Sequence, residues 1–135
     1  MPYGSQINAE ICNESDLTLG MPKRFNAIFN NGSPALYPMD IVHRCESFAT
    51  VAEKDILNCG FMIGEDKLSG IPVVLRHRYD DGDVILYACN PIFRCQQDTT
   101  YKLLANALFI RCDRDLGIKT VHYRTHYEIP TMYLL

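Results

Sequence analysis

The sequence has little that would place it in a membrane or on a nucleic acid. Its apolar runs are short, and none approaches the roughly 20 residues that a bilayer-spanning helix needs. The N-terminal segment MPYGSQINAE lacks a basic region followed by an apolar core, so it predicts no signal peptide. The net charge of −3 argues against a general nucleic-acid binder. We therefore expect a cytoplasmic protein with no membrane or nucleic-acid partner, exported only if it is a piece of a longer precursor.

The composition is that of an ordinary globular domain. Of the 135 residues, 47% are hydrophobic and 21% are charged, which argues against disorder and suits one domain. Because the chain is large enough for a core and shows no signal peptide, we predict free, buried thiols rather than a disulfide framework. The cysteines concerned lie scattered through apolar segments: Cys12, Cys45, Cys59, Cys89, Cys95 and Cys112.

The first half of the chain predicts short strands. Residues 5–13 alternate roughly between polar and apolar side chains, as a half-buried strand does. Residues 25–29 form a short apolar run that also predicts a strand, and the loop sequence NNGSP follows at 30–34. Residues 41–44 predict a further short strand, and residues 48–54 a helical turn.

The second half has clearer signals. Residues 57–63 are apolar and β-prone, and residues 72–78 alternate enough to form a half-buried strand. The Asp-Gly pair within residues 79–83 predicts a tight hairpin. Residues 84–89 are apolar throughout, which predicts a central strand covered on both faces.

A helix over residues 100–110 closes the pattern, with Asp98 or Thr99 as its N-cap. Its predicted buried stripe contains Tyr101, Leu104 and Leu108, widened by Leu103 and Ala107. The expected fold is an α/β sheet with an antiparallel, β-rich portion and a closing strand, loop and helix. Since one helix cannot cover two faces of a sheet, we expect a partner or a further segment to cover the rest.

Three stretches, in register, resemble one known family. SDLTLGMP (residues 15–22) matches a "HPLAYGLP" pattern, and NCGFMIGEDKLSGIPVV (58–74) matches one like "SGWLLGEEYLAGKAAVV". DDGDVILYACNPIFRCQQDTTYKLLANAL (80–108) matches "GKGRVVLFGFRPQFRAQTHGTFKLLFNAL". Over about residues 4–110 the chain thus resembles the C-terminal glutamine-amidotransferase-like domain of bacterial zinc-carboxypeptidase-family proteins, which are carboxypeptidase A-like metallopeptidases.

This resemblance implies a partial class I amidotransferase-like, flavodoxin-like fold over residues 1–110, with a tail of unknown role over 111–135. It also implies a non-catalytic accessory module for scaffolding or ligand binding, without a cofactor, because the family's zinc-binding catalytic domain precedes this one. The chain departs from the family pattern at Ser15 and Asp16, which replace His-Pro, and at Cys45, which replaces an aromatic residue. The implied partners are an upstream catalytic domain or a separate chain.

Asn90 and Arg94 are the candidate ligand-binding residues. They follow a predicted buried strand and precede a helix, the position at which open α/β sheets bind ligands. An arginine there could hold a carboxylate with two parallel hydrogen bonds. The competing interpretation, which we favour, is that both residues shape the connecting loop, since strand-end position is the only support for a site.

A zinc site is the alternative. His43 and Glu46 have the His-x-x-Glu spacing of the carboxypeptidase family, and His122 or His126 could supply a third ligand. Under this interpretation the chain is a small stand-alone zinc-dependent hydrolase. Motifs this short recur by chance, so we prefer the accessory module. A third possibility is a subunit, or a homo-oligomer, that completes its sheet with another chain.

Overall fold

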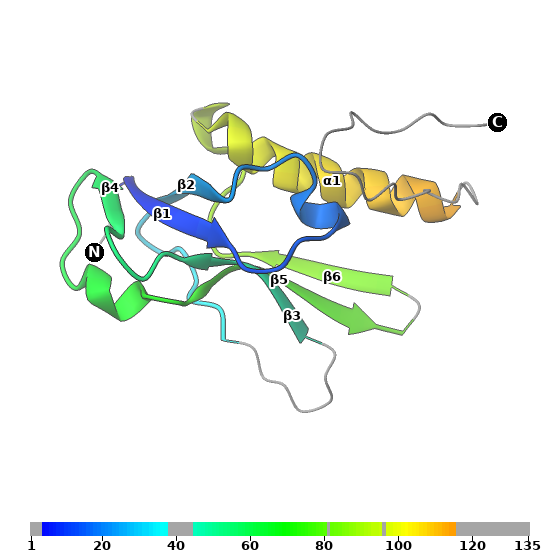
Figure 1. Ribbon diagram of the computed structural model, residues 1–135, viewed down its shortest axis with the longest axis horizontal. Helices are drawn as coiled ribbons and strands as arrows, with labels where there is room; N and C mark the ends of the chain where they lie inside the picture. Colours follow the sequence, from blue (N-terminus) through cyan, green and yellow to red (C-terminus); the bar gives the residue numbers. More distant parts are fainter. Residues whose placement is uncertain (1–3, 38–44, 81, 96, 116–135) are drawn as a thin grey trace.

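A computed structural model describes residues 4–37, 45–80, 82–95 and 97–115. Strands dominate, and one α-helix follows them (Figure 1). The strands are β1 (Ser5–Ile11), β2 (Arg24–Phe29), β3 (Cys45–Val51), β4 (Leu57–Cys59), β5 (Pro72–Tyr79) and β6 (Gly82–Tyr87). Three short 3-10 helices, η1 (Asp16–Thr18), η2 (Glu65–Leu68) and η3 (Phe93–Cys95), lie in connections, and α1 spans Asp98–Asp115.

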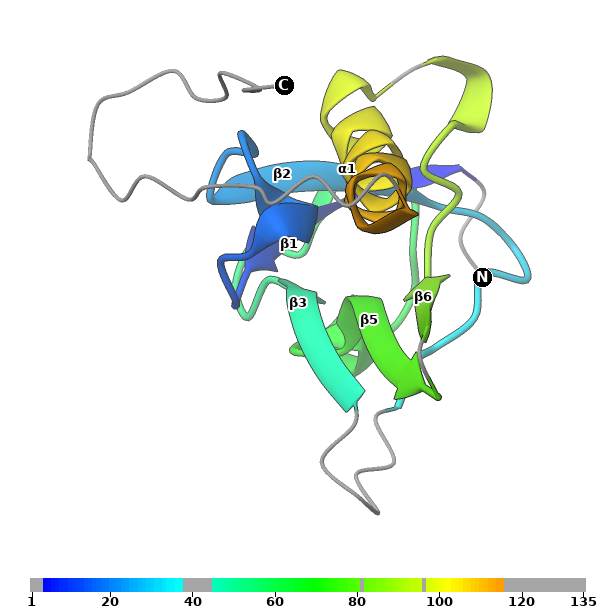
Figure 2. The same ribbon diagram turned by 90° about the vertical axis from the view of Figure 1, so that its right-hand side faces the viewer.

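The strands form one sheet in the order β2-β1-β3-β5-β6, with β4 also paired to β1. Every pairing among the described strands is antiparallel. The sheet curls around one side of α1, as the view along the helix shows (Figure 2). The expected α/β content and antiparallel portion are therefore confirmed, as a curled antiparallel sheet with a C-terminal helix.

Strand β1 is central to this sheet because one of its edges pairs with two strands, β3 and β4. Residues 9–11 pair with β3, and residues 6–7 pair with β4. Asn8 lies between the two pairings, where its amide donates to Ile56 O (2.8 Å) and its carbonyl accepts from Ala52 N (2.9 Å). The Asn8 side chain also donates to Asp55 O at 2.6 Å. Backbone and side chain of Asn8 thus both hold the turn between β3 and β4, and Arg24 Nη2 adds a hydrogen bond to Lys54 O at 3.0 Å.

Gly60 ends β4 and permits a close approach to β1. Its φ is +102°, a conformation that L residues rarely adopt. A Cβ at this position would lie 2.9 Å from the Cα of Ser5. Ser5 Oγ donates to Phe61 O at 2.8 Å, which holds the two segments together. The strand predicted over residues 57–63 therefore stops at Cys59.

The core lies between the concave face of the sheet and α1. Phe48 from β3, Ile7 from β1 and Leu103 from α1 are fully buried within it. The phenol of Tyr87 donates to the Leu103 carbonyl at 3.1 Å, which ties β6 to the helix. One helix thus seals one face of the sheet in the described part of the chain.

Several predictions of local structure were wrong. Residues 48–51 belong to strand β3 rather than to a helical turn, because pairing with β1 and β5 outweighs weak local propensity. Strand β6 is an edge strand among the described residues, and Val84 and Leu86 are 45% and 43% exposed rather than covered on both faces. The strand predicted over 41–44 lies outside the described residues.

The predicted helix is confirmed, and its predicted buried stripe is confirmed at Leu103 and Ala107 but wrong at Leu108. Leu103 is fully buried and Ala107 packs against the core, whereas Leu108 is 63% exposed. The helix also runs past residue 110 to Asp115, so it crosses the predicted boundary between domain and tail. The polar Thr100 is buried too, and its hydroxyl donates to Pro91 O at 2.8 Å.

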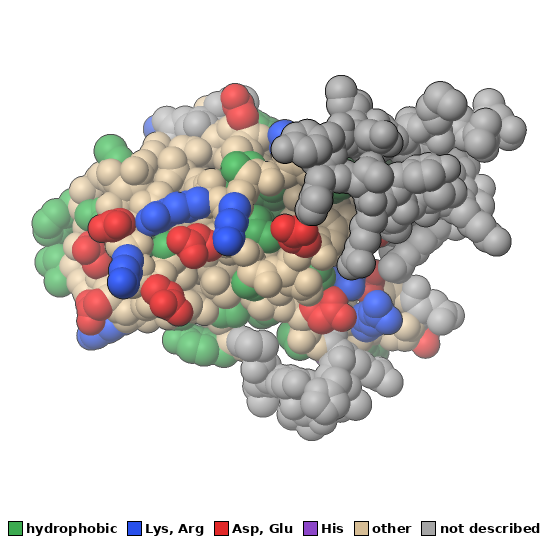
Figure 3. Space-filling model, in the orientation of Figure 1, with side chains coloured by type: hydrophobic (Ala, Val, Ile, Leu, Met, Phe, Trp, Pro, Cys, Tyr) green, Lys and Arg blue, Asp and Glu red, His purple; other side chains and the backbone are tan. Residues whose placement is uncertain are grey.

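The surface shows no large patch of one charge sign on the face that Figure 3 presents, where acidic and basic side chains are interspersed. Hydrophobic side chains gather there at the end of the molecule that carries β4 and η2 (Figures 1 and 3). Within the described residues, no helix is long and apolar enough to cross a membrane.

Candidate functional site

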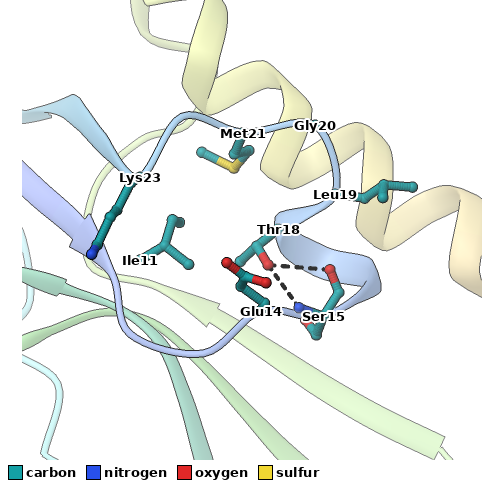
Figure 4. A pocket seen from close by; sticks show the side chains of 8 residues that line it. All are labelled: Ile11, Glu14, Ser15, Thr18, Leu19, Gly20, Met21 and Lys23. Carbon is teal, nitrogen blue, oxygen red and sulfur yellow. Dashed lines mark hydrogen bonds between the residues drawn. The ribbon is translucent and has the colours of Figure 1, made fainter. Parts of the chain in front are cut away.

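A hollow of about 270 Å³ lies inside the loop that joins β1 to β2 (Figure 4). We call residues 12–23 the β1–β2 loop; it contains η1, and its ends are joined by a hydrogen bond from Ile11 N to Lys23 O (2.8 Å). The hollow combines apolar and polar side chains from this loop and the end of β1. Its lining residues are Ile11, Glu14, Ser15, Thr18, Leu19, Gly20, Met21 and Lys23.

The loop is held by its own side chains. The Ser15 amide donates to Thr18 Oγ1 at 2.8 Å, and Ser15 Oγ accepts from Leu17 N at 3.2 Å. This reciprocal arrangement is a capping box, which satisfies donors at the start of a helical turn. The Thr18 hydroxyl also donates within the loop, to Asn13 O or Ser15 O. These hydroxyls are therefore occupied by structural hydrogen bonds.

Helix α1 fixes the loop from outside. Asn106 Nδ2 donates to both Leu17 O and Leu19 O at 3.0 Å. Lys102 Nζ donates to Gly20 O at 2.8 Å. Three loop carbonyls thus depend on two side chains of one helix, and the hollow has a fixed wall.

The lining chemistry suits binding rather than catalysis. Glu14 supplies an acidic group, and Ile11 and Met21 supply apolar surface, whereas the amino group of the exposed Lys23 points away from Glu14 (Figure 4). Among the lining residues, no nucleophile is paired with a general base, as activation would require. The hollow could hold a small molecule with both charged and apolar parts.

Asn90 and Arg94 lie in the loop before α1 and are both exposed. Asn90 Oδ1 accepts from Ile92 N at 3.0 Å, and Asn90 O accepts from Phe93 N at 3.3 Å, so Asn90 shapes a turn. Arg94 has a left-handed φ of +49°, and its guanidinium lies 5.3 Å from the centre of the Phe93 ring. Ligand binding by these residues stays a prediction.

Glu46, from the predicted zinc set, lies on β3 and contacts Arg76 of β5. Its Oε2 lies 2.6 Å from Arg76 Nη2, and the guanidinium also stacks 4.9 Å from the centre of the Phe48 ring. Arg76 Nε is buried without a hydrogen-bond partner in the described part of the protein. A metal at Glu46 would have to compete with this guanidinium.

The remaining members of that set, His43, His122 and His126, lie outside the described residues. Within residues 4–37, 45–80, 82–95 and 97–115, no group of three or more histidine, cysteine or acidic residues is placed to hold a metal. The zinc site therefore stays a prediction.

The cysteines whose side chains are described are free, as predicted, but they are not uniformly buried. Cys12 and Cys59 are exposed, Cys45 is half-buried and Cys89 is buried. Burial raises the pKa of the Cys89 thiol from 9.0 to about 11, so this group stays protonated near neutral pH. Cys89 is thus a core residue rather than an activated nucleophile.

The open edge of β6 is a second candidate, for protein binding. Ala88 N donates to Val73 O of β5 at 2.8 Å, which shows which alternate residues of this strand form hydrogen bonds with β5. Because alternate residues of an antiparallel strand direct both backbone groups to the same neighbour, Asp83, Ile85 and Tyr87 direct theirs away from β5. No described strand pairs with that side of β6.

Sequence reasoning missed both features. The spacing of Ser15 and Thr18 before a glycine was a detectable capping signal, but the helix contacts that enclose the hollow join residues far apart in the sequence. The apolar run at 84–89 concealed an edge strand, because such a run does not reveal which faces are covered. No known family model matches the sequence, and a search of curated proteins finds no significant match.

Proposed function

We propose that this protein is a non-catalytic accessory module that binds another polypeptide by adding a strand to the open edge of β6. The observation that carries the proposal is that no described strand pairs with the outer side of β6, where the backbone groups of Ile85 and Tyr87 point away from β5 and the Val84 and Leu86 side chains are exposed. Exposed flat edges with apolar side chains are templates for strand addition. Main-chain hydrogen bonds would supply affinity, and pockets beside the strand would supply specificity.

The resemblance to the amidotransferase-like domain of zinc-carboxypeptidase-family proteins supports the same proposal. In this view the antiparallel sheet is the C-terminal portion of a flavodoxin-like fold, and β6 is the strand at which the remainder of the sheet would join. The joining strand would come from an upstream catalytic domain or from a separate chain. The order of β6, connecting loop and α1 agrees with the matched motif at residues 80–108.

A photo-crosslinking amino acid at Leu86, introduced into the protein in its source cells, tests this proposal. We expect an adduct whose partner peptide, identified by mass spectrometry, has an extended and alternating sequence. The same probe at Glu53, an exposed residue in the turn after β3, is the control and should give no such adduct. Equal labelling at the two positions, or none at Leu86, would contradict the proposal.

Binding of a small molecule in the hollow of the β1–β2 loop is a second candidate function. Its support is the fixed 270 Å³ space with Glu14 and Lys23 among the lining residues. Zwitterionic dipeptides such as glycyl-leucine would match this lining. Titration should shift the amide resonances of Gly20 and Met21, and the double substitution Glu14→Gln and Lys23→Gln should abolish the shift. Unchanged resonances across a dipeptide panel would refute this candidate.

The zinc hydrolase makes a different prediction. Purified protein would then contain stoichiometric zinc, held by His43, Glu46 and His122 or His126, and His43→Ala would remove it. A folded protein free of zinc would eliminate this alternative.

A further inference from the structure

One flank of α1 is apolar and lies on the side of the molecule that carries β6. Lys102 and Asn106 hold the β1–β2 loop on the other side of the helix. Because successive residues of an α-helix are about 100° apart, Leu104 and Leu108 lie on the flank opposite to them. We call these two residues the leucine flank; Leu104 is half-buried and Leu108 is 63% exposed. The view along α1 shows the β1–β2 loop on one side and β6 on the other (Figure 2), so the leucine flank lies above the space beyond β6.

Strand β6 has the composition of an inner strand, although no described strand pairs with its outer side. Residues 84–87, VILY, contain none of the lysines, prolines or bulges with which natural edge strands avoid unwanted pairing. The backbone groups of Ile85 and Tyr87 point away from β5, and their side chains pack against the core beneath α1. A strand added beside them would pair with β6 and be covered by the leucine flank.

The sequence after α1 contains a segment with the pattern of such a strand. Residues 121–129, VHYRTHYEI, alternate strictly, which predicts a strand with one buried face. The odd positions are apolar apart from one threonine, and the even positions are polar: Val121, Tyr123, Thr125, Tyr127 and Ile129 against His122, Arg124, His126 and Glu128. This segment lies outside the described residues, and its pattern is one of sequence.

A short connection separates this segment from α1, which ends at Asp115. Residues 116–120 form the connection, a length within the roughly 2 to 6 residues that usually join a helix to a strand. They include Gly117, two positions after the last helical residue, where glycine commonly stops a helix. The chain can therefore pass from α1 into a strand without a long loop.

The topology directs that strand to the open edge. Helix α1 follows β6 and runs antiparallel to it, so α1 ends near the start of β6 (Figure 1). A strand that continues from there runs parallel to β6, and α1 becomes the crossover helix between two parallel strands. Such crossovers are right-handed in about 98% of cases. With α1 above the sheet, a right-handed crossover places the new strand on the side of β6 away from β5, which is the open side (Figure 2).

We propose that residues 121–129 of this chain form a parallel strand on the open edge of β6, and that a partner polypeptide binds there by displacing them. This inference rests on the proposed function, strand addition at β6, and adds its regulation. Parallel pairing is slightly less stable per residue than antiparallel pairing, and Thr125 interrupts the apolar face of the segment. An antiparallel partner strand with an unbroken apolar face therefore has the advantage in the exchange.

Two matched double variants of the full chain distinguish the two faces of the segment. Tyr123→Lys and Tyr127→Lys place charges on the face that packs beneath α1, and this inner-face variant should release the segment. His122→Lys and His126→Lys place the same number of lysines on the opposite face. This outer-face variant should leave the segment paired with β6.

Hydrogen exchange of the purified proteins gives the first readout. The Ile85 and Tyr87 amides point away from β5, so only a strand on the open edge protects them. We expect them to exchange about tenfold or more slowly in the natural chain and the outer-face variant than in the inner-face variant. The Leu86 amide points toward β5 and is the internal reference, whose exchange should not change. Protection should not depend on protein concentration, because the strand belongs to the same chain.

Three results would overturn the strand within the chain. They are unprotected Ile85 and Tyr87 amides in the natural chain, equal protection in the two variants, and protection that rises with protein concentration, since a second copy would then supply the strand. Far-ultraviolet circular dichroism should show that both variants are folded. If one is not, the exchange of these two amides in the natural chain and its concentration dependence still decide the matter.

Crosslinking from Leu86 in the source cells tests the displacement. We expect the inner-face variant to give a several-fold higher yield of the partner adduct than the natural chain or the outer-face variant. Equal yields from all three would overturn the displacement but leave strand addition by a partner intact. No adduct from any of them would overturn the proposed function together with the displacement, and the exchange data would still decide whether residues 121–129 occupy the edge.

Discussion

Replacing Leu103 by alanine should remove a large share of the stability of this protein. Leu103 lies in α1, is 0% exposed and packs into the core between the helix and the sheet. Leucine-to-alanine changes at such sites cost about 2 to 5 kcal/mol, through lost transfer free energy and the cavity left behind. Natural domains have a free energy of unfolding of about 5 to 15 kcal/mol, so the variant should be strongly destabilised.

Leu108→Ala provides the comparison, because Leu108 lies on the same helix and is 63% exposed. Surface substitutions of this kind usually change stability by less than about 0.5 kcal/mol. Alanine also has the highest helix propensity, which offsets part of any lost packing. The two variants carry the same chemical change, so their difference reports burial alone.

Equilibrium urea denaturation measures the two free energies of unfolding. Far-ultraviolet circular dichroism follows the helix and strands, and tyrosine fluorescence follows tertiary structure, since the chain has 8 tyrosines and no tryptophan. We expect the midpoint to fall for Leu103→Ala without a change in the urea dependence. Equal losses in the two variants, or a larger loss for Leu108→Ala, would refute the packing of α1 described above.

Three further changes test other parts of the fold. Gly60→Ala should lower the free energy of unfolding by about 1 to 3 kcal/mol in thermal or urea denaturation, because the φ of Gly60 is +102° and a Cβ there would meet β1. Gly20→Ala, with open space around it, should lower that free energy by about 1 kcal/mol. Equal losses in the two variants would contradict this prediction. Burial raises the pKa of the Cys89 thiol from 9.0 to about 11, so the buried neutral thiol favours the folded state fully below pH 9. The free energy of unfolding should then fall by roughly 2 to 3 kcal/mol as pH rises through 11. Cys89→Ala should flatten that part of the stability profile in denaturation at successive pH values, and an unchanged slope would count against it. Glu46→Gln should cost about 1 to 2 kcal/mol by leaving the Arg76 guanidinium uncompensated, and adding Arg76→Met should recover part of that loss in a double-mutant cycle.

Local signals in the sequence predicted the elements that depend on near neighbours. The Asp-Gly turn identified the β5–β6 hairpin, and apolar alternation identified β1 and β5. The helix was also predicted from its apolar period, whereas the expected N-cap residues, Asp98 or Thr99, lie inside the first turn of α1. These features are determined within windows of a few residues.

Features that depend on distant pairing could not be predicted. Strand β3 has weak local propensity and forms because β1 and β5 lie on either side of it. The predicted buried side of α1 was too wide, because Leu103 and Leu104 are equally apolar and only the position of the sheet shows that Leu103 is the fully buried one and that Leu108 is exposed. The candidate hollow was missed for the same reason, since its outer wall is completed by Asn106. The predicted roles of Asn90 and Arg94 as ligand-binding residues stay untested.

The contacts between α1 and the β1–β2 loop also constrain the order in which the chain can reach its native state. Lys102 and Asn106 hold carbonyls that lie 82 to 89 residues earlier in the sequence. During synthesis, the first hairpin can form long before these side chains leave the ribosome, but its loop gains its last hydrogen bonds only when α1 docks. Such sequence-distant closures slow folding, because chain entropy is lost before the contacts compensate for it. The hollow in this loop should therefore be among the last parts of the described structure to form, and its completion should coincide with the docking of the helix.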